Sequence, residues 1–431
     1  MGVGLSHPYF WTLWGVLDTT VICIMSTLSP IMTEYFQDRS EIFESERILK
    51  ESYTPNDLPE REEQLKRLGL EVLSPVLNDA PPHNAFLYGK PGQGKTAAAR
   101  FLLEELQEEV DERSGINLTT IFQTCKGHHS SYQVACDLVE QLTGDNPNGH
   151  PKRKVFARLY DALQEIGGIV VIVLDEVDNI GNKDMILYEL PRARDNSHIE
   201  DMDVSVIGIS NDMTFYEELD PRAKDSLCEV EIHFPPYDAD QLRSILNRRS
   251  EKAFVDSAVT QEAIALAAAL AAQDLGSARQ AIRYLYKAGE FAALNDEPQV
   301  CEEHVRKAED HVEQMNIAQS IRDLTIQDQL ALLALTSLAT GNETPAPTPE
   351  VYSRYTDITS HVDTNSIAMR RVRSHLHDLD MIGVVSGAKR SGGSRGGPKY
   401  YWELNTDLDT TVNVLTEENR FNDVLSLIDR P

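Results

Sequence analysis

Positive charge is scarce in this chain, which has 40 Lys and Arg residues against 69 Asp and Glu residues and a formal net charge of −29. Such a surface repels phosphate, so the composition as a whole argues against a nucleic-acid binder of the usual basic kind. Cells that accumulate molar salt reverse this inference, because screening there removes the long-range repulsion. We interpret the acidity as the mark of a salt-filled cytoplasm and look for local basic islands instead.

Cysteine is also scarce, and none of the five cysteines stands at a spacing typical of metal sites. A zinc-finger arrangement is therefore excluded, and we expect reduced, mostly buried thiols in a cytoplasmic protein. The five are Cys23, Cys125, Cys136, Cys228 and Cys301.

The first residues lack Lys and Arg altogether, and the first positive charge is Arg39. An apolar stretch covers residues 9–28, but it has no basic n-region, and Asp18 lies at its middle. From Met32 the sequence takes on the charged, helical texture of the rest. Our interpretation is that translation starts at Met32 and that residues 1–31 are a mis-annotated or non-native extension. A membrane anchor and a genuine extension are the alternatives.

A glycine-rich loop carries the strongest functional signal. The apolar strand 85–88 leads into Gly-Lys-Pro-Gly-Gln-Gly-Lys-Thr at 89–96, and a helical pattern follows. Glycines let backbone N–H groups turn toward phosphates at a helix N-terminus, as in the P-loop of ATPases. Lys95 should reach the β and γ phosphates, and the Thr96 hydroxyl should ligate Mg²⁺. The other nucleotide-binding positions of the loop are Gly92, Gln93 and Gly94.

Two further apolar runs end in polar residues. Residues 169–174 form an uninterrupted apolar run before Asp175 and Glu176, as expected of a central parallel strand. Asp175 should hold Mg²⁺ through water, and Glu176 should polarise the attacking water. Another predicted strand ends at Asn211, which either orients that water or caps a turn.

Residues 239–317 read as helices after the break at Pro235-Pro236, a natural hinge into a second module. Ahead of that hinge, a short helix at 221–227 carries Arg222, which is either a solvated arginine or a finger for a neighbouring subunit's γ-phosphate. The third of the later helices has an apolar face and carries Arg279, which either touches the nucleotide from a helical lid or lies on the surface. We assign that face to Ala278, Ala281, Ile282, Leu285, Ala288 and Ala292.

The last third of the chain predicts a winged-helix domain. Helices at 325–339 and 349–359, joined by the loop 341–349, precede a third helix that opens at Asn365 or Ser366 and closes at Gly383. Two strands, 384–387 and 399–404, form the wing. Residues 370–399 contain seven basic residues and only two acidic ones, which predicts DNA binding, although winged helices also serve as protein docks. The basic residues are Arg370, Arg371, Arg373, Lys389, Arg390, Arg395 and Lys399.

Four stretches in this order resemble the archaeal AAA+ initiators related to the eukaryotic origin-recognition complex and its cell-division-control partner, and the acidity indicates a haloarchaeal member. They are ESYTPNDLPEREEQLKRL, GKPGQGKT, VIVLDEVDNI and LDPRAKDSLCEVEIHFPPYDADQL. The resemblance places Tyr53 and Pro55 near the adenine, and Tyr237 and Arg249 in the pocket. It also makes Arg222 the finger and Arg279 the second sensor. The family often has Gly-Asp before the Ala-Arg pair, whereas this chain has Ser277 in place of the acid.

The expected fold is therefore α/β: an AAA+ P-loop domain at 32–236, a helical lid at 237–318 and an α+β winged-helix domain at 319–431. The resemblance implies an origin-binding initiator that promotes loading of the MCM helicase, alone, by self-association or paired with a paralogue. ATP or ADP with Mg²⁺ would be the cofactors, and weak ATP hydrolysis would act as a switch. The expected location is the nucleoid, without membrane attachment.

Two other functions share these motifs. A motor or clamp-loader ATPase would show vigorous, DNA-stimulated turnover. A transcriptional regulator would combine the winged helix with a vestigial ATPase; against this, every ATPase position holds a competent residue.

Overall fold

The computed structural model describes residues 39–51, 53–113, 115–180, 184–362, 364–390, 399–417 and 421. The predicted extension at 1–31 lies outside these residues. The chain forms two compact units that divide between Val305 and Arg306. Among the described residues, no helix is both long enough and apolar enough to cross a membrane.

A five-stranded parallel sheet forms the centre of the N-terminal unit, in the order β2-β3-β4-β1-β5. Strand β3, which lies between β2 and β4, is covered on both faces, because Val170, Ile172 and Leu174 enter one core while the residues between them enter the other. This two-sided burial explains the uninterrupted apolar run and confirms the predicted α/β class. The strands are β1 (Ala85–Tyr88), β2 (Leu118–Thr124), β3 (Gly168–Asp175), β4 (Met202–Ser210) and β5 (Val230–His233).

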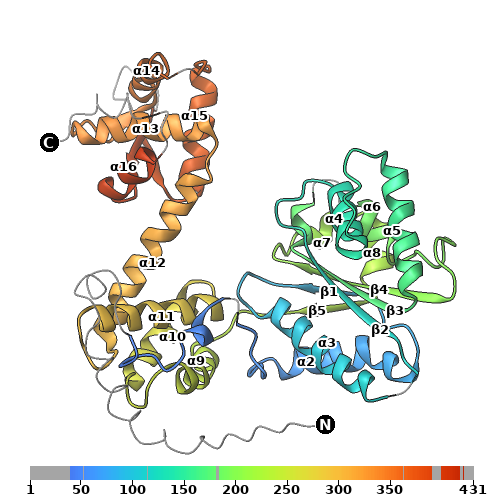
Figure 1. The fold of residues 1–431 in the computed structure, drawn as a ribbon. Helices are drawn as coiled ribbons and strands as arrows, with labels where there is room; N and C mark the ends of the chain where they lie inside the picture. Colours follow the sequence, from blue (N-terminus) through green and yellow to red (C-terminus); the bar gives the residue numbers. More distant parts are fainter. Residues whose placement is uncertain are drawn as a thin grey trace, which may run out of the picture. The chain divides into compact units, whose positions relative to one another are not determined.

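Helices cover both faces of this sheet (Figure 1). One face packs against α2 (Glu62–Arg67), η2 (Leu68–Leu73), η3 (Ser74–Asn78) and α3 (Lys95–Asp111). The other packs against α4 (Ser131–Thr143), α5 (Lys152–Ile166), η4 (Val177–Asn179), α6 (Asp184–Glu189), α7 (Phe215–Glu218) and α8 (Pro221–Leu227). The carboxyl ends of β3 and β4 consequently open toward the loop between β1 and α3, where parallel sheets bind ligands.

Three capped helices follow the sheet and form a helical subdomain: α9 (Ala239–Ala253), α10 (Gln261–Asp274) and α11 (Ala278–Leu294). Asp238, Thr260 and Ser277 each accept a backbone N–H at a helix N-terminus, as capping residues do. The segment before the sheet, with η1 (Glu46–Leu49), packs here too, since Phe43 stacks on Phe254 with ring centroids 4.9 Å apart. Helix α12 (Glu302–Arg322) then runs through the predicted boundary at residue 318.

The C-terminal unit has α13 (Ile326–Thr340) at its centre, where residues 330–335 are fully buried. Around it lie α14 (Thr348–Thr359), α15 (Met369–Met381), α16 (Leu408–Thr416) and an antiparallel sheet of order β6-β8-β7. Its strands are β6 (Ala346–Pro347), β7 (Val385–Arg390) and β8 (Lys399–Leu404). Helix–turn–helix followed by a hairpin is the predicted winged-helix arrangement.

Two details of this unit differ from the prediction. The stretch assigned to a loop contains β6, a strand of two residues that pairs Ala346 with Trp402 and is too short to show any alternation. The third helix begins after Ala368 rather than at Asn365 or Ser366. Backbone N–H of Ile367 donates to the Tyr355 hydroxyl over 3.2 Å, and this bond holds the residues before α15 out of the helix.

Candidate nucleotide site and winged-helix surface

The predicted phosphate-binding loop lies between β1 and α3 and requires its glycines. Gly92 and Gly94 have φ angles of 77° and 86°, in the left-handed region that other residues avoid. A Cβ atom at Gly92 would lie 1.9 Å from the Ser277 Oγ. Backbone N–H of Ala278 donates to the Gly92 carbonyl over 3.0 Å, so the start of α11 lies directly against the loop.

Lys95 lies at the first position of α3 and is 4% exposed. Its ammonium donates to the carbonyls of Gly89 at 2.7 Å and Lys90 at 2.8 Å. Burial lowers the pKa of Lys95 to about 8, although the nearby Asp175 carboxylate opposes this shift. The loop carbonyls thus hold the ammonium where phosphate oxygens could take their place.

Thr96 and Asp175 meet at the predicted metal position. The Thr96 hydroxyl donates to Oδ2 of Asp175 over 2.8 Å, although 79 residues separate them in the chain. A hydroxyl and a carboxylate beside a phosphate-binding loop are the oxygen ligands that Mg²⁺ prefers. These donors therefore fit a Mg²⁺ ion.

Glu176 and Asn211 lie at the ends of neighbouring strands. Nδ2 of Asn211 is 3.5 Å from Oε1 of Glu176, and both residues line the same cavity. Sequence reasoning missed Asp178, whose Oδ1 accepts from the Asn211 backbone N–H at 3.0 Å and from the Ser210 hydroxyl at 2.9 Å. Asp178 therefore joins the loop after β3 to the end of β4. In the sequence, the only sign of this role is that Asp178 follows Asp175 by three residues.

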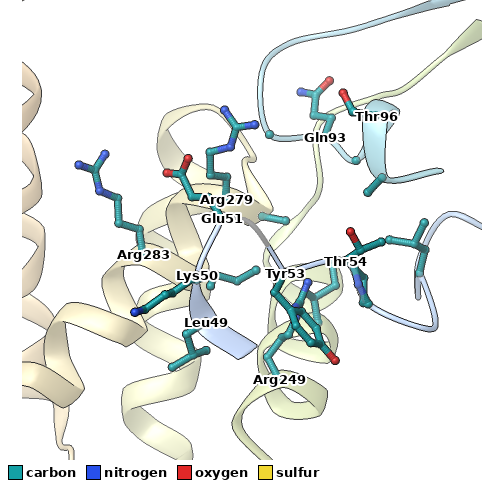
Figure 2. A pocket seen from close by; sticks show the side chains of 18 of the residues that line it. Leu49, Lys50, Glu51, Tyr53, Thr54, Gln93, Thr96, Arg249, Arg279 and Arg283 are labelled. Atoms are coloured by element: carbon teal, nitrogen blue, oxygen red, sulfur yellow. The ribbon is translucent and has the colours of Figure 1, made fainter. Parts of the chain in front are cut away.

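A cavity of about 760 Å³ opens beside this loop. It brings together the five residues assigned to nucleotide contact from outside the P-loop, namely Tyr53, Pro55, Tyr237, Arg249 and Arg279. Figure 2 shows Tyr53 beside Arg249, with Gln93 and Thr96 of the loop across the cavity and Arg279 on the helical side.

Arg249 is fixed from two sides. Its guanidinium lies 4.5 Å from the centre of the Tyr53 ring, and its Nη1 donates to the Ile48 carbonyl over 2.8 Å. Burial lowers the pKa of Arg249.

The cavity is positive although the chain is strongly acidic. Nine Lys and Arg side chains line it against four Asp and Glu side chains, an excess of five positive charges. Of the nine, Arg279 and Arg283 come from α11 and Arg248 and Arg249 from α9. An acidic protein that gathers cations around one hollow has a site suited to a multiply charged anion.

Ser277 takes over the capping role at the start of α11. Its Oγ accepts from the Gln280 N–H, which is what a short acid at that position would do. The replacement of the family's acid by Ser277 therefore leaves the start of α11 capped, and Arg279 still lines the cavity.

The prediction of which residues form the buried apolar face of α11 is partly wrong. Ala278 and Ile282 line the cavity, whereas Tyr284, Gly289 and Ala293 are buried with the remainder of the face. The sequence predicts which residues of a helix form an apolar stripe. It does not predict which neighbouring element, or which cavity, each edge of that stripe contacts.

Arg61 is a second residue that sequence reasoning missed. It is 2% exposed, its Nε donates to the Gln93 carbonyl at 3.0 Å, and its Nη2 donates to the Pro235 carbonyl at 2.6 Å. The guanidinium also stacks 3.6 Å from the centre of the Tyr237 ring. Arg61 thus ties the P-loop to the hinge before α9. A lone arginine between glutamates gave the only signal in the sequence.

Arg222 lies away from the cavity of its own chain. Its side chain is 77% exposed, and its Nε donates to Asp220 over 3.2 Å at the start of α8. Asp220 also caps the helix by accepting the Arg222 backbone N–H. The finger role in a neighbouring subunit stays a prediction.

Six of the seven predicted DNA-binding residues lie on α15 and the hairpin in the described part of the chain, and all six are exposed. Arg373 lies over the Tyr400 ring at 4.7 Å and Arg390 over the Tyr401 ring at 5.4 Å. These contacts hold the stems of both arginines against β8. Arg395 lies outside the described residues. The exposed remainder are Arg370, Arg371, Lys389 and Lys399.

Comparison with family models gives the class of the molecule. Residues 81–210 match an AAA domain, 243–310 the Cdc6 AAA+ ATPase-type lid domain, and 319–414 the CDC6 C-terminal winged helix domain. The protein is therefore an AAA+ protein with a helical lid and a winged helix, as predicted. The predicted domain boundaries themselves stay a prediction.

Individual relatives are similar over nearly their whole length. The chain is 41% identical to ORC1-type DNA replication protein 15 of Haloarcula marismortui, over 89% of this chain and 94% of that protein. It is 39% identical to an ORC1-type DNA replication protein of Pyrococcus horikoshii, over 83% of this chain and 86% of that protein. The solved structure of Aeropyrum pernix ORC1 in complex with DNA matches with a TM-score of 0.79 and 36% identity, over 89% and 99%. The chain belongs to the ORC1-type DNA replication protein family, which confirms the resemblance in its sequence.

Proposed function

We propose that this protein binds replication-origin duplex under the control of ATP and promotes loading of the MCM helicase. The observation that carries the proposal is the cationic cavity: the P-loop, the ends of β3 and β4 and the first turn of α11 all meet there. Support for DNA as the partner comes from the exposed basic residues of α15 and the hairpin, and from the DNA complex of the Aeropyrum pernix relative.

ATP or ADP would lie with its phosphates on the loop N–H groups and Lys95, its adenine near Tyr53, and its γ-phosphate within reach of Arg279. Mg²⁺, held by Thr96 and through water by Asp175, would neutralise charge on the phosphate oxygens. Glu176 and Asn211 would position the attacking water. Because α11 starts against the loop, occupancy by ATP or ADP would set how tightly the lid closes.

Slow hydrolysis suits such a switch, since the bound state must last long enough for helicase recruitment. Arg222 would complete the site of a neighbouring copy or paralogue on DNA. The acidic remainder of the surface would keep the protein in solution in a salt-rich, nucleoid-containing cytoplasm.

Genome-wide mapping of the sites that the tagged protein occupies at native salt tests the proposal. We expect peaks at positions where replication starts, as measured independently by marker frequency. Peaks at promoters with no relation to replication starts would favour a transcriptional regulator instead.

A further inference from the structure

The C-terminal unit contains a group of ligand-type side chains that the nucleotide and DNA sites do not use. Asp328 of α13 and His375 and Asp378 of α15 each offer one ligand atom, and these atoms lie within 4.8 Å of one another. In the part of the chain that the structure describes, no other three His, Cys, Asp or Glu side chains converge in this way.

Helix geometry explains the convergence. His375 and Asp378 are three residues apart on α15, a spacing that puts both side chains on one face of a helix. Asp328 lies in the first turn of α13, and its Oδ1 is 2.6 Å from Nδ1 of His375. Two helices that pack together thus supply the three groups from opposite sides.

The innermost ligand is already oriented. The Asp328 side chain is 11% exposed, and its other oxygen, Oδ2, accepts a hydrogen bond from the Thr325 hydroxyl. Such an outer partner fixes the carboxylate in place, and its second oxygen, Oδ1, faces His375.

A hydrogen bond between Asp328 and His375 accounts for two of the three groups but not for Asp378. The Asp378 carboxylate has no hydrogen-bond or ion-pair partner in the described chain, although its helix α15 carries three exposed arginines. It lies within 4.8 Å of a second carboxylate, that of Asp328 on α13. One imidazole nitrogen and two carboxylate oxygens form a donor set suited to Zn²⁺ and similar divalent transition ions.

We propose that Asp328, His375 and Asp378 bind a divalent transition-metal ion of the Zn²⁺ type, with water completing its coordination. The ion fastens α15 to α13 and cancels the charge of Asp378. Metal binding itself requires neither nucleotide nor DNA; only its consequence, tighter duplex binding by α15, rests on the proposed function.

Zinc titration of the full chain tests the site, after chelator treatment and in the absence of nucleotide and Mg²⁺. Calorimetry should show a Zn²⁺ site whose affinity falls at least about tenfold in Asp378→Asn and His375→Gln. Asp378→Asn breaks no contact in the described chain, so folding is retained. Asp357→Asn, an exposed aspartate on α14, is the matched control and should bind as the unchanged protein does.

Cobalt substitution supplies a second readout. Bound Co²⁺ should give visible absorption that both site variants lose and Asp357→Asn keeps. The proposal is overturned if Zn²⁺ does not bind, if Asp378→Asn binds with unchanged affinity, or if Co²⁺ gives an intense thiolate band from the cysteines.

Discussion

Gly92 of the P-loop and Ser277 at the start of α11 lie so close that a single methyl group on Gly92 would be 1.9 Å from the Ser277 Oγ. This contact joins the phosphate-binding loop to the helical lid. Gly92 is therefore required for this close approach of loop and lid as well as for its positive φ.

Gly92→Ala should lower ATP affinity roughly tenfold, or about 1.4 kcal/mol, because the methyl group pushes α11 away from the loop. Holding an alanine at positive φ costs roughly 1–2 kcal/mol of stability by itself. Gly144→Ala is the matched control, since Gly144 has a φ of 74° and nothing within 4 Å of an added Cβ. It should show the same loss of thermal stability with unchanged ATP affinity. Equal ATP affinities in the two variants would mean that the Gly92–Ser277 contact has no bearing on the nucleotide.

Lys95 should make nucleotide binding depend on pH. Its pKa is lowered to about 8 by burial, so in the nucleotide-free protein the ammonium loses its proton as the pH rises through 8. Phosphate binds the charged form, and ATP affinity should therefore fall above pH 8 with uptake of a proton on binding. In Lys95→Arg this pH dependence should disappear, because a guanidinium stays charged throughout. A flat profile in the unchanged protein between pH 7 and 9.5 would contradict this account.

Lys95→Ala and Glu176→Gln should separate binding from hydrolysis. The first removes the main counter-charge of the phosphates and should abolish ATP binding in a filter assay. The second keeps the shape of the cavity and should leave ATP bound but unhydrolysed. Lys90→Ala, an exposed lysine of the same loop, is the control and should bind ATP normally. If Lys95→Ala held ATP at full affinity, the nucleotide site would be misassigned.

Arg222 should act on a neighbouring subunit, because its side chain is 77% exposed and lines no part of its own cavity. Arg222→Ala should bind ATP normally and hydrolyse it poorly on DNA. Mixed with Lys95→Ala, which binds no ATP but still presents Arg222, it should regain part of the activity. Arg192→Ala, which removes an arginine paired with Asp225, should hydrolyse ATP normally. Failure of the mixture to regain activity would remove the finger assignment.

The order of the main elements could be predicted from sequence because each carries strong local chemistry. The P-loop is recognised by glycines before a lysine and a threonine. Strand β3 is recognised by an uninterrupted apolar run, because a strand that is buried on both faces needs apolar side chains on both. Asp175 ends β3 and Asn211 directly follows β4, so the parallel sheet brings both residues to its carboxyl edge.

Residues whose role depends on distant backbone could not be predicted. Arg61 donates to the carbonyls of Gln93 and Pro235, and neither acceptor leaves any trace in a side-chain pattern. The start of α15 is set by the Tyr355 hydroxyl, a residue of another helix. Similarly, Asp328 meets His375 only because α13 and α15 pack together.

DNA binding by so acidic a protein is the central claim. Counterion release loses most of its contribution at molar salt, so origin binding there must rest on groove contacts by few arginines. Arg390→Ala should weaken origin binding by about 1–3 kcal/mol, and by about 2–4 kcal/mol together with Arg395→Ala, while ATP binding is unchanged. Arg354→Ala, an arginine of the same unit beside Glu343, should have little effect.

The most direct test is a binding titration of the unchanged protein with ATP on origin and scrambled duplexes, at about 0.3 M and about 2 M KCl. The account predicts that preference for the origin duplex persists at the higher salt and is reduced by Arg390→Ala. Equal affinity for both duplexes at both salts, or full origin affinity in the Arg390→Ala, Arg395→Ala double variant, would contradict it.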